Sequence, residues 1–121
     1  MDLETIRAYC SAKPGVTGEF PFDERTLVFK VMGKMFALID VIEPETLNLK
    51  CDPEKAVGLR ERYDEVRPGY HMNKVHWNTV HLGGAVPHRE IFSWIDDSYN
   101  LVVKGLKKSL RQELEKIFCG S

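Results

Sequence analysis

Residues 67–84 read RPGYHMNKVHWNTVHLGG and hold three of the four histidines and one of the two tryptophans. Pro68-Gly69 is a turn pair, because proline fixes φ and glycine accepts either sign. Residues 75–82 are rich in types favoured in strands. We therefore predict a strand there, paired with residues 70–72 in a hairpin whose tip is Asn73-Lys74.

Strand alternation divides this stretch into two faces, because successive side chains point to opposite sides of a sheet. Trp77 and Thr79 share one face, and Asn78 and Val80 share the other. Trp77 beside Lys74 could stack on and hydrogen-bond a nucleic-acid base. It could equally be a core residue whose polar neighbours satisfy the backbone of the hairpin.

A second hairpin is predicted over residues 26–41, where Gly33-Lys34 separates two apolar runs and suits a type II′ turn. That register pairs Val31 with Phe36 and Phe29 with Leu38. The face predicted to enter the core then carries Leu27, Phe29, Val31, Phe36 and Leu38. The opposite face is also apolar, so we expect something to cover part of it.

Helices are expected at both ends of the chain and in its middle. Asp2 caps the first, which Pro14-Gly15 stops. Asp52 caps a second that ends near Tyr63. Residues 88–104 form the longest helix, and the last covers residues 109–118. The contact face of this last helix is predicted to be Leu110, Leu114 and Ile117. Further strands are expected over residues 16–22 and 46–51.

This order of elements lacks the strand–helix–strand alternation of a parallel sheet. We therefore predict an α+β fold: an antiparallel sheet of about six strands, with helices packed mainly on one face. A length of 121 residues indicates one domain over residues 1–121, and 43% hydrophobic residues suffice for its core. No apolar run approaches the roughly 20 residues of a membrane helix, so no membrane partner is expected.

Three cysteines without a CxxC spacing indicate reduced thiols and a cytoplasmic location. His76 and His81 should point to opposite faces, so we expect no metal site. Ser98 and Cys51 are nucleophiles by type only, and no recognisable catalytic or phosphate-binding motif accompanies them. We therefore expect no enzymatic activity and no cofactor.

The net charge is only −1, but the C-terminal part is basic. Four of its basic residues form a run without an intervening acid: Lys104, Lys107, Lys108 and Arg111. The run is either the solvated end of a helix or a phosphate-contacting patch. If the long helix continues through Gly105, all four side chains fall on one side.

The run from His71 to Val80, His-x-Asn-Lys-x-His-Trp-x-Thr-Val, resembles the signature of the MmcQ/YjbR family. Smaller matches extend the resemblance from about residue 5 to about residue 112, among them Pro14-Gly15, Arg67-Pro68 and Val86-Pro87. The chain departs from the family at Gly83-Gly84, where Asp-Gly is common, and it lacks the proline often found after the long helix.

The resemblance implies a compact α+β fold, often compared with double-wing domains, and a non-catalytic role in DNA binding. Any DNA contact should be weak and salt-dependent. The alternative is a protein-interaction or structural domain without a nucleic-acid role. The candidate nucleic-acid-binding residues are Arg67, His71, Asn73, Lys74, His76, Trp77, Lys104, Lys107, Lys108 and Arg111.

Overall fold

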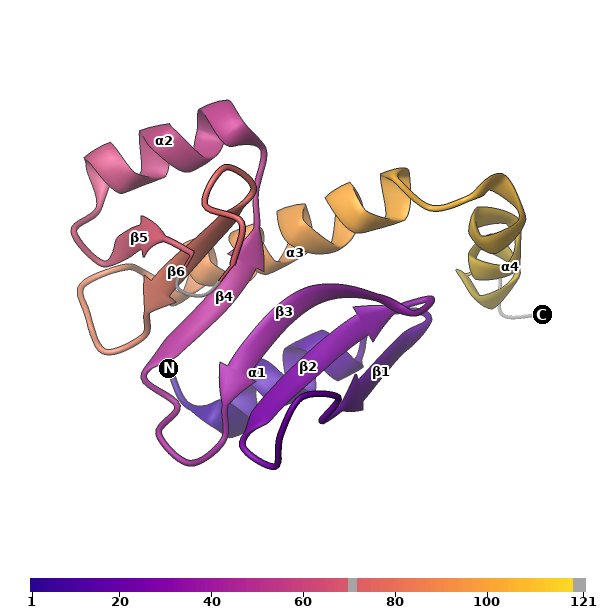
Figure 1. Ribbon diagram of the computed structural model, residues 1–121, viewed down its shortest axis with the longest axis horizontal. Helices are drawn as coiled ribbons and strands as arrows, with labels where there is room; N and C mark the ends of the chain where they lie inside the picture. Colours follow the sequence, from indigo (N-terminus) through magenta and orange to yellow (C-terminus); the bar gives the residue numbers. More distant parts are fainter. Residues whose placement is uncertain (70–71, 119–121) are drawn as a thin grey trace.

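The computed structural model describes residues 1–69 and 72–118 of the chain. Ten elements follow one another in the order helix, four strands, helix, two strands and two helices (Figure 1). They are α1 (Leu3–Ser11), β1 (Val16–Glu19), β2 (Thr26–Val31), β3 (Lys34–Asp40), β4 (Thr46–Lys50), α2 (Pro53–Arg62), β5 (Val66–Pro68), β6 (Trp77–His81), α3 (His88–Lys104) and α4 (Lys108–Phe118).

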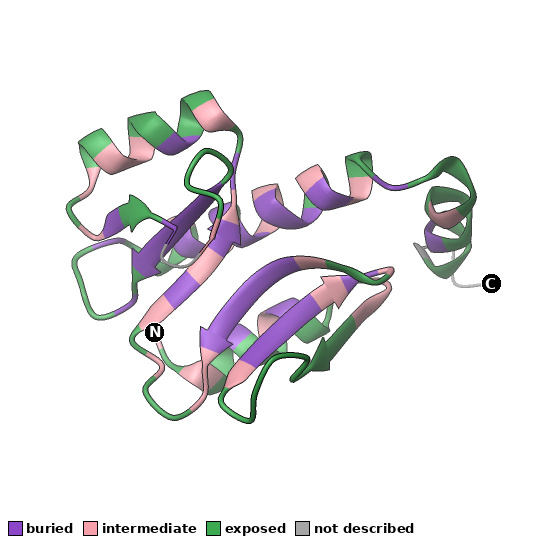
Figure 2. Cartoon of the chain, viewed as in Figure 1, coloured by how far each residue is buried: buried purple, intermediate pink, exposed green. Residues whose placement is uncertain are grey.

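The strands form one antiparallel sheet in the order β1-β2-β3-β4-β6-β5. Buried residues from α1, α3, α4 and one face of this sheet share the main hydrophobic core, and the half-buried Leu59 of α2 packs against it. Figure 1 shows α1 and α3 behind the sheet, and Figure 2 shows the buried residues concentrated in the central strands and α3. The predicted α+β fold, with helices mainly on one face, is confirmed.

Both predicted N-caps are present, because the Asp2 and Asp52 carboxylates accept backbone N–H groups that a helix start leaves unpaired. The longest helix also begins and ends as predicted, at His88 and Lys104. Its apolar stripe is buried against β2, β3 and β4: Ile91, Trp94, Ile95, Ser98, Tyr99 and Val102. Among the described residues, no helix is long and apolar enough to cross a bilayer.

The hairpin of β2 and β3 differs from the prediction in its turn. Its two turn residues are Met32 and Gly33, with φ of 49° and 85°. Two positive φ values are typical of a type I′ turn, whose twist matches that of the flanking strands. The turn thus lies one residue earlier than predicted, and Val31 pairs with Lys34.

An irregularity opposite Phe29 and Lys30 makes Phe36 an extra residue in β3. Phe29 and Phe36 are both buried, as predicted. The prediction that Leu38 joins the same face is wrong, because the bulge shifts the register so that Ala37 and Ile39 enter the main core. Leu38 instead lies on the opposite face.

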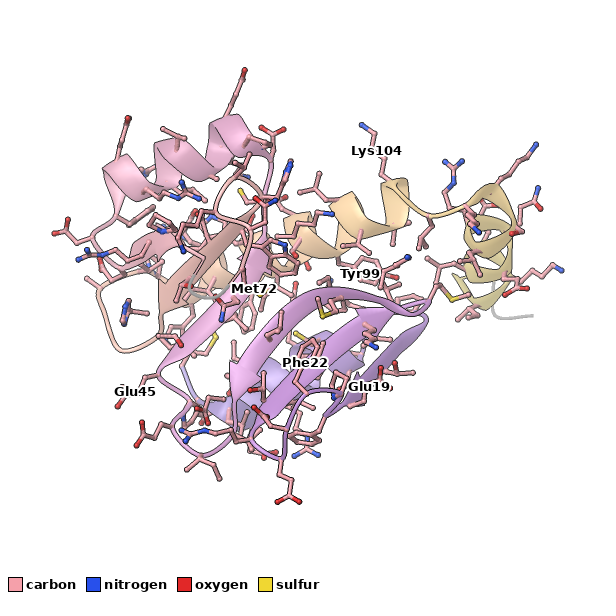
Figure 3. The ribbon with its side chains drawn as sticks, in the orientation of Figure 1. Glu19, Phe22, Glu45, Met72, Tyr99 and Lys104 are labelled. Carbon is pink, nitrogen blue, oxygen red and sulfur yellow. The ribbon has the colours of Figure 1, made fainter. Side chains whose placement is uncertain are left out.

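That opposite face is partly covered, as predicted. Val28, Leu38 and Trp77 form a second hydrophobic cluster there, and Met35 and Met72 pack against it. Met72 comes from the segment between β5 and β6 and stands in front of the sheet in Figure 3. The sheet therefore has one face covered by helices and one face covered only by side chains.

Candidate nucleic-acid interface

The central hairpin is built differently from the prediction. β6 pairs with β5 at residues 66–68, so residues 69 and 72–76 belong to the connection between the two strands and Lys74 is not at a two-residue tip. The predicted strand over residues 70–72 falls partly outside the described residues, as does the candidate His71. β5 ends at Pro68, and the Gly69 N–H still donates to the Trp77 carbonyl at 2.8 Å, one step beyond the Pro68–Asn78 pair.

Arg60, in the last turn of α2, holds this loop onto the sheet. Its Nε donates to Asn78 Oδ1 at 2.7 Å, and its terminal nitrogen donates to the carbonyls of Trp77 (3.2 Å) and Lys74. Asn78 is 2% exposed, so the guanidinium satisfies a buried acceptor. The sequence offered no signal for this role, because an arginine at a helix end is ordinarily solvated.

Below Asn78 lies a cavity between α2, α3 and the sheet, with a volume of about 10 Å³. The Asn78 Nδ2 group has no hydrogen-bond partner in the described part of the chain. A cavity of this size holds about one water molecule. The arrangement therefore fits a single bridging water rather than an organic ligand.

The loop side chains proposed as contacts have unequal freedom. The Asn73 side chain accepts the Val75 N–H at 2.9 Å, and Lys74 Nζ donates to the Gly69 carbonyl at 3.1 Å. Arg67 Nε donates to the Asp64 carbonyl at 3.0 Å. His76 is exposed. All four remain at the surface, but Asn73 and Lys74 take part in the structure of the loop itself, and Arg67 of β5 bonds to the turn that precedes its strand.

Trp77 is 8% exposed and packs in the second hydrophobic cluster. The interpretation of Trp77 as a core residue is therefore confirmed, and its ring faces are not open platforms for a base. One edge of the residue still borders a groove of about 370 Å³ at the end of the sheet. The other lining residues are Lys34, Met35, Lys50, Leu101, Val102 and Gly105.

Lys34 and Lys50 were missed by the sequence reasoning. They lie at the beginning of β3 and the end of β4, which the antiparallel register places at the same end of the sheet. Ser98 of α3 reinforces this end, since its hydroxyl donates to the Phe36 carbonyl (2.5 Å) and accepts the Lys50 N–H (2.9 Å). Both partners of Ser98 are backbone groups, which supports its interpretation as a packing residue.

The four predicted cations at the C-terminal side do not lie on one continuous helix. The helix α3 ends at Lys104, and Gly105 caps it by donating to the Leu101 and Val102 carbonyls. Leu106 then turns into the core, and α4 starts at Lys108 in a different direction (Figure 1). The condition for all four side chains to share one helix face, a helix that continues through Gly105, is therefore not met. A separate last helix is present, as predicted, and the bend before it accompanies the burial of Leu106 and Leu114.

All four of these side chains are nevertheless exposed. Lys104 points away from the body of the molecule (Figure 3) and also borders a cleft of about 290 Å³ with Lys55 and Asp97. Ile117, predicted as part of the contact face of α4, is 49% exposed, whereas Leu114 is buried.

Ion pairing divides the cations of the chain into two groups. Five basic residues pair with carboxylates: Arg7, Lys13, Arg25, Lys30 and Lys55. Within residues 1–69 and 72–118, no ion pair involves Lys34, Lys50, Lys104, Lys107, Lys108 or Arg111. We call these six residues the free basic end. Three of them line or adjoin the groove beside Trp77, so their charges are available to an anionic partner.

The described residues contain no group of three or more His, Cys, Asp or Glu side chains that could hold a metal ion. Burial raises the pKa of the Cys10 thiol to about 12, and burial also raises the pKa of Cys51. Both thiols are therefore protonated at neutral pH and are poor nucleophiles and poor metal ligands.

Comparison with known proteins gives related chains of similar length. The family model described as YjbR matches residues 11–101. The uncharacterized protein YjbR of Escherichia coli K12 is 35% identical over 118 residues, which is 97% of this chain and all of that protein. The uncharacterized protein YbdF of Escherichia coli O157:H7 is 39% identical over 106 residues, 87% of each chain.

A solved structure supports the same assignment at the level of the fold. The crystal structure of a Deinococcus radiodurans protein with a DUF419 domain is 42% identical, with a TM-score of 0.88. The match covers 93% of this chain and 87% of that one. A Pseudomonas syringae crystal structure is 30% identical, with a TM-score of 0.71 over 84% of this chain and 98% of that one. On the sequence matches and the shared fold together, the chain belongs to the YjbR family.

Proposed function

We propose that this protein is a non-catalytic domain that binds nucleic acid through the free basic end. The observation that supports this proposal is the gathering of unpaired cations at one end of the sheet, where Lys34 and Lys50 line a groove beside the end of α3. Lysines that have no carboxylate partner can replace the counterions condensed on a phosphate backbone.

The contacts should be to phosphates rather than to base edges. Lysine is a compact point charge on a flexible stem, which suits phosphates but reads bases poorly. The Trp77 ring is already packed against Val28 and Leu38, so it offers no face for stacking. Binding should therefore be nearly independent of sequence, with a dissociation constant of about 10⁻⁴ to 10⁻⁶ M at physiological salt.

Fluorescence anisotropy with a labelled 20-base-pair duplex, at 50 and 200 mM NaCl, tests the proposal. Each neutralised phosphate contributes a slope of about −0.9 in log K against log salt, so four contacts give about −3.6. Two charge reversals separate the two halves of the free basic end: Lys34→Glu with Lys50→Glu, and Lys107→Glu with Lys108→Glu. Each should weaken binding at least tenfold for every sequence and reduce the slope by about 2.

The matched control is Arg7→Glu with Arg89→Glu, which changes the net charge equally at exposed positions on α1 and at the start of α3. This control should retain most of the affinity. If no duplex binds at 50 mM NaCl, or if all three double variants lose affinity equally, the proposal is wrong. A role in protein interaction would then be the better assignment.

A further inference from the structure

A second surface lies on the helix-free face of the sheet. Phe22, in the loop between β1 and β2, is 66% exposed there and lines a groove with Leu38 and Met72. The same loop and the neighbouring loop between β3 and β4 carry two more exposed hydrophobic side chains, Phe20 (47%) and Ile42 (65%). Exposed hydrophobic side chains beside a groove are typical of interaction surfaces. This surface is separate from the free basic end, because none of the lysines there lines it.

The two loops are held together by hydrogen bonds. The Arg25 guanidinium pairs with Asp40 at 2.6 Å, and the Val41 N–H donates to the Arg25 carbonyl at 2.8 Å. Asp40 also accepts the Ile42 N–H at 2.8 Å, while Asp23 accepts the Thr26 N–H at 2.7 Å. These bonds fix the backbone of the two loops, which lowers the entropy that the loops lose on binding.

A groove of about 490 Å³ runs beside these loops. Phe22 stands at one side of it and Met72 at the other, both in front of the sheet in Figure 3. Leu38 of β3 and Asn48 of β4 form part of its floor. The groove therefore has a mixed lining, with apolar side chains from Phe22, Leu38 and Met72 among polar ones, and it is wide enough for a few side chains of an extended or helical segment.

The surroundings of this groove are acidic. Asp23 and Asp40 line the groove, and Glu24 and Glu43 lie in the same two loops. Asp40 pairs with Arg25, whereas no ion pair among the described residues involves Asp23, Glu24 or Glu43. Backbone N–H donors from Thr26 and Arg25 lower the pKa of Asp23, so it stays ionised at neutral pH.

We propose that this acidic, apolar groove, defined by Phe22, Leu38, Asn48 and Met72, binds a basic segment of a partner protein. The segment would place a large apolar side chain between Phe22 and Met72, with lysine or arginine residues on either side of it. Charge complementarity supports this choice, because phosphate groups would be repelled by the unpaired carboxylates of Asp23, Glu24 and Glu43. A second copy that used its free basic end here would form a head-to-tail contact, which generates open filaments unless it closes into a ring.

Selection from a phage-displayed library of random 12-residue peptides on the full chain tests this proposal. Phage that also bind the variant Phe22→Ser/Glu24→Lys/Glu43→Lys are removed at each round. The expected consensus has a Leu, Met or Phe flanked by lysine or arginine. A consensus without basic residues, or no enrichment, would overturn the proposal.

The selected peptide is then measured by fluorescence anisotropy against single-purpose variants. Phe22→Ser should weaken binding at least tenfold, and Glu24→Lys with Glu43→Lys should do the same and reduce the salt dependence. The controls are Val57→Ser, an exposed apolar position on α2, and Glu113→Lys with Glu115→Lys, which changes the net charge equally on α4. Both controls should bind within twofold of the wild type.

Two further measurements separate this surface from the other possibilities. Phe22→Ser should leave duplex binding unchanged, because Phe22 lies outside the free basic end. The two proposals can therefore fail independently of each other. Sedimentation velocity at 100 µM should show a monomer; self-association that Phe22→Ser abolishes would assign the groove to a second copy and refute a partner protein. Equal peptide binding by wild type and all variants would also refute it.

Discussion

Our most quantitative prediction concerns Arg60→Ala, which removes the hydrogen bonds that hold the loop before β6 onto the sheet. Asn78 is 2% exposed, and its Oδ1 accepts from Arg60 Nε. Truncation leaves this buried acceptor without a donor, which costs about 1–3 kcal/mol. The Trp77 carbonyl keeps the Gly69 N–H, and the Lys74 carbonyl lies on an exposed loop where water can replace the guanidinium. The expected loss in the free energy of unfolding is therefore about 2 kcal/mol.

The assay is urea denaturation at 25 °C followed by circular dichroism, with thermal unfolding as a second measurement. A loss of about 2 kcal/mol corresponds to a fall in Tm of roughly 6–10 °C for a chain of this length. Arg60→Lys should lose about 1 kcal/mol, because an ammonium retains the charge but not the planar fork that contacts a side chain and two carbonyls.

Arg62→Ala is the matched control. Arg62 lies on the same helix, and its guanidinium carbon lies 5.2 Å from the centroid of the Tyr63 ring, a cation–π contact. Its truncation should cost less than about 0.5 kcal/mol. A double-mutant cycle between Arg60→Ala and Asn78→Ala should give a coupling energy of about 1 kcal/mol or more. If Arg60→Ala and Arg62→Ala lose the same free energy of unfolding, or if the coupling energy is zero, Arg60 does not stabilise the loop.

Three other predictions follow from local geometry. Gly15→Ala should lower the stability more than Gly33→Ala. Both residues have a positive φ, which costs about 1–2 kcal/mol for alanine. A Cβ added at Gly15 would lie 2.6 Å from Leu114 Cδ1, whereas a Cβ added at Gly33 would have no atom beyond its chain neighbours within 4 Å. Urea denaturation of the two variants checks the order, and equal losses would contradict it. Burial and the hydrogen bond to Asp96 raise the pKa of Tyr9 to about 12. The protonated hydroxyl is favoured in the folded state, so its contribution to stability is complete below pH 10 and is lost between pH 10 and 12. A titration followed by the absorbance at 295 nm should therefore show that Tyr9→Phe removes a phenol that ionises near pH 12. If the phenol that Tyr9→Phe removes ionises near pH 10 instead, the prediction is wrong. Elemental analysis of the purified protein should find less than 0.1 zinc per chain, and one zinc per chain that is lost in His76→Ala would overturn this expectation.

Local sequence alone determined most of the elements and the fold class. Asp2 and Asp52 mark where two helices begin, and Gly105 marks where α3 ends, as their local sequence predicts, because capping depends on a few neighbouring residues. The apolar stripe of α3 was readable because a helix face repeats at a fixed period. Strand alternation likewise placed Trp77 and Asn78 on opposite faces correctly, since that period is two.

Only the tertiary structure decided the register of the β2–β3 hairpin and the direction of α4. The bulge at Phe36 moves Leu38 to the opposite face, and the Phe36 carbonyl there accepts a hydrogen bond from Ser98, which is distant in the sequence. The bend after Lys104 exists because Leu106 and Leu114 both reach the core. The pairing of Arg60 with Asn78, and the meeting of Lys34 with Lys50, are contacts between distant segments. Such contacts depend on how whole elements pack, so no local pattern in the sequence reports them.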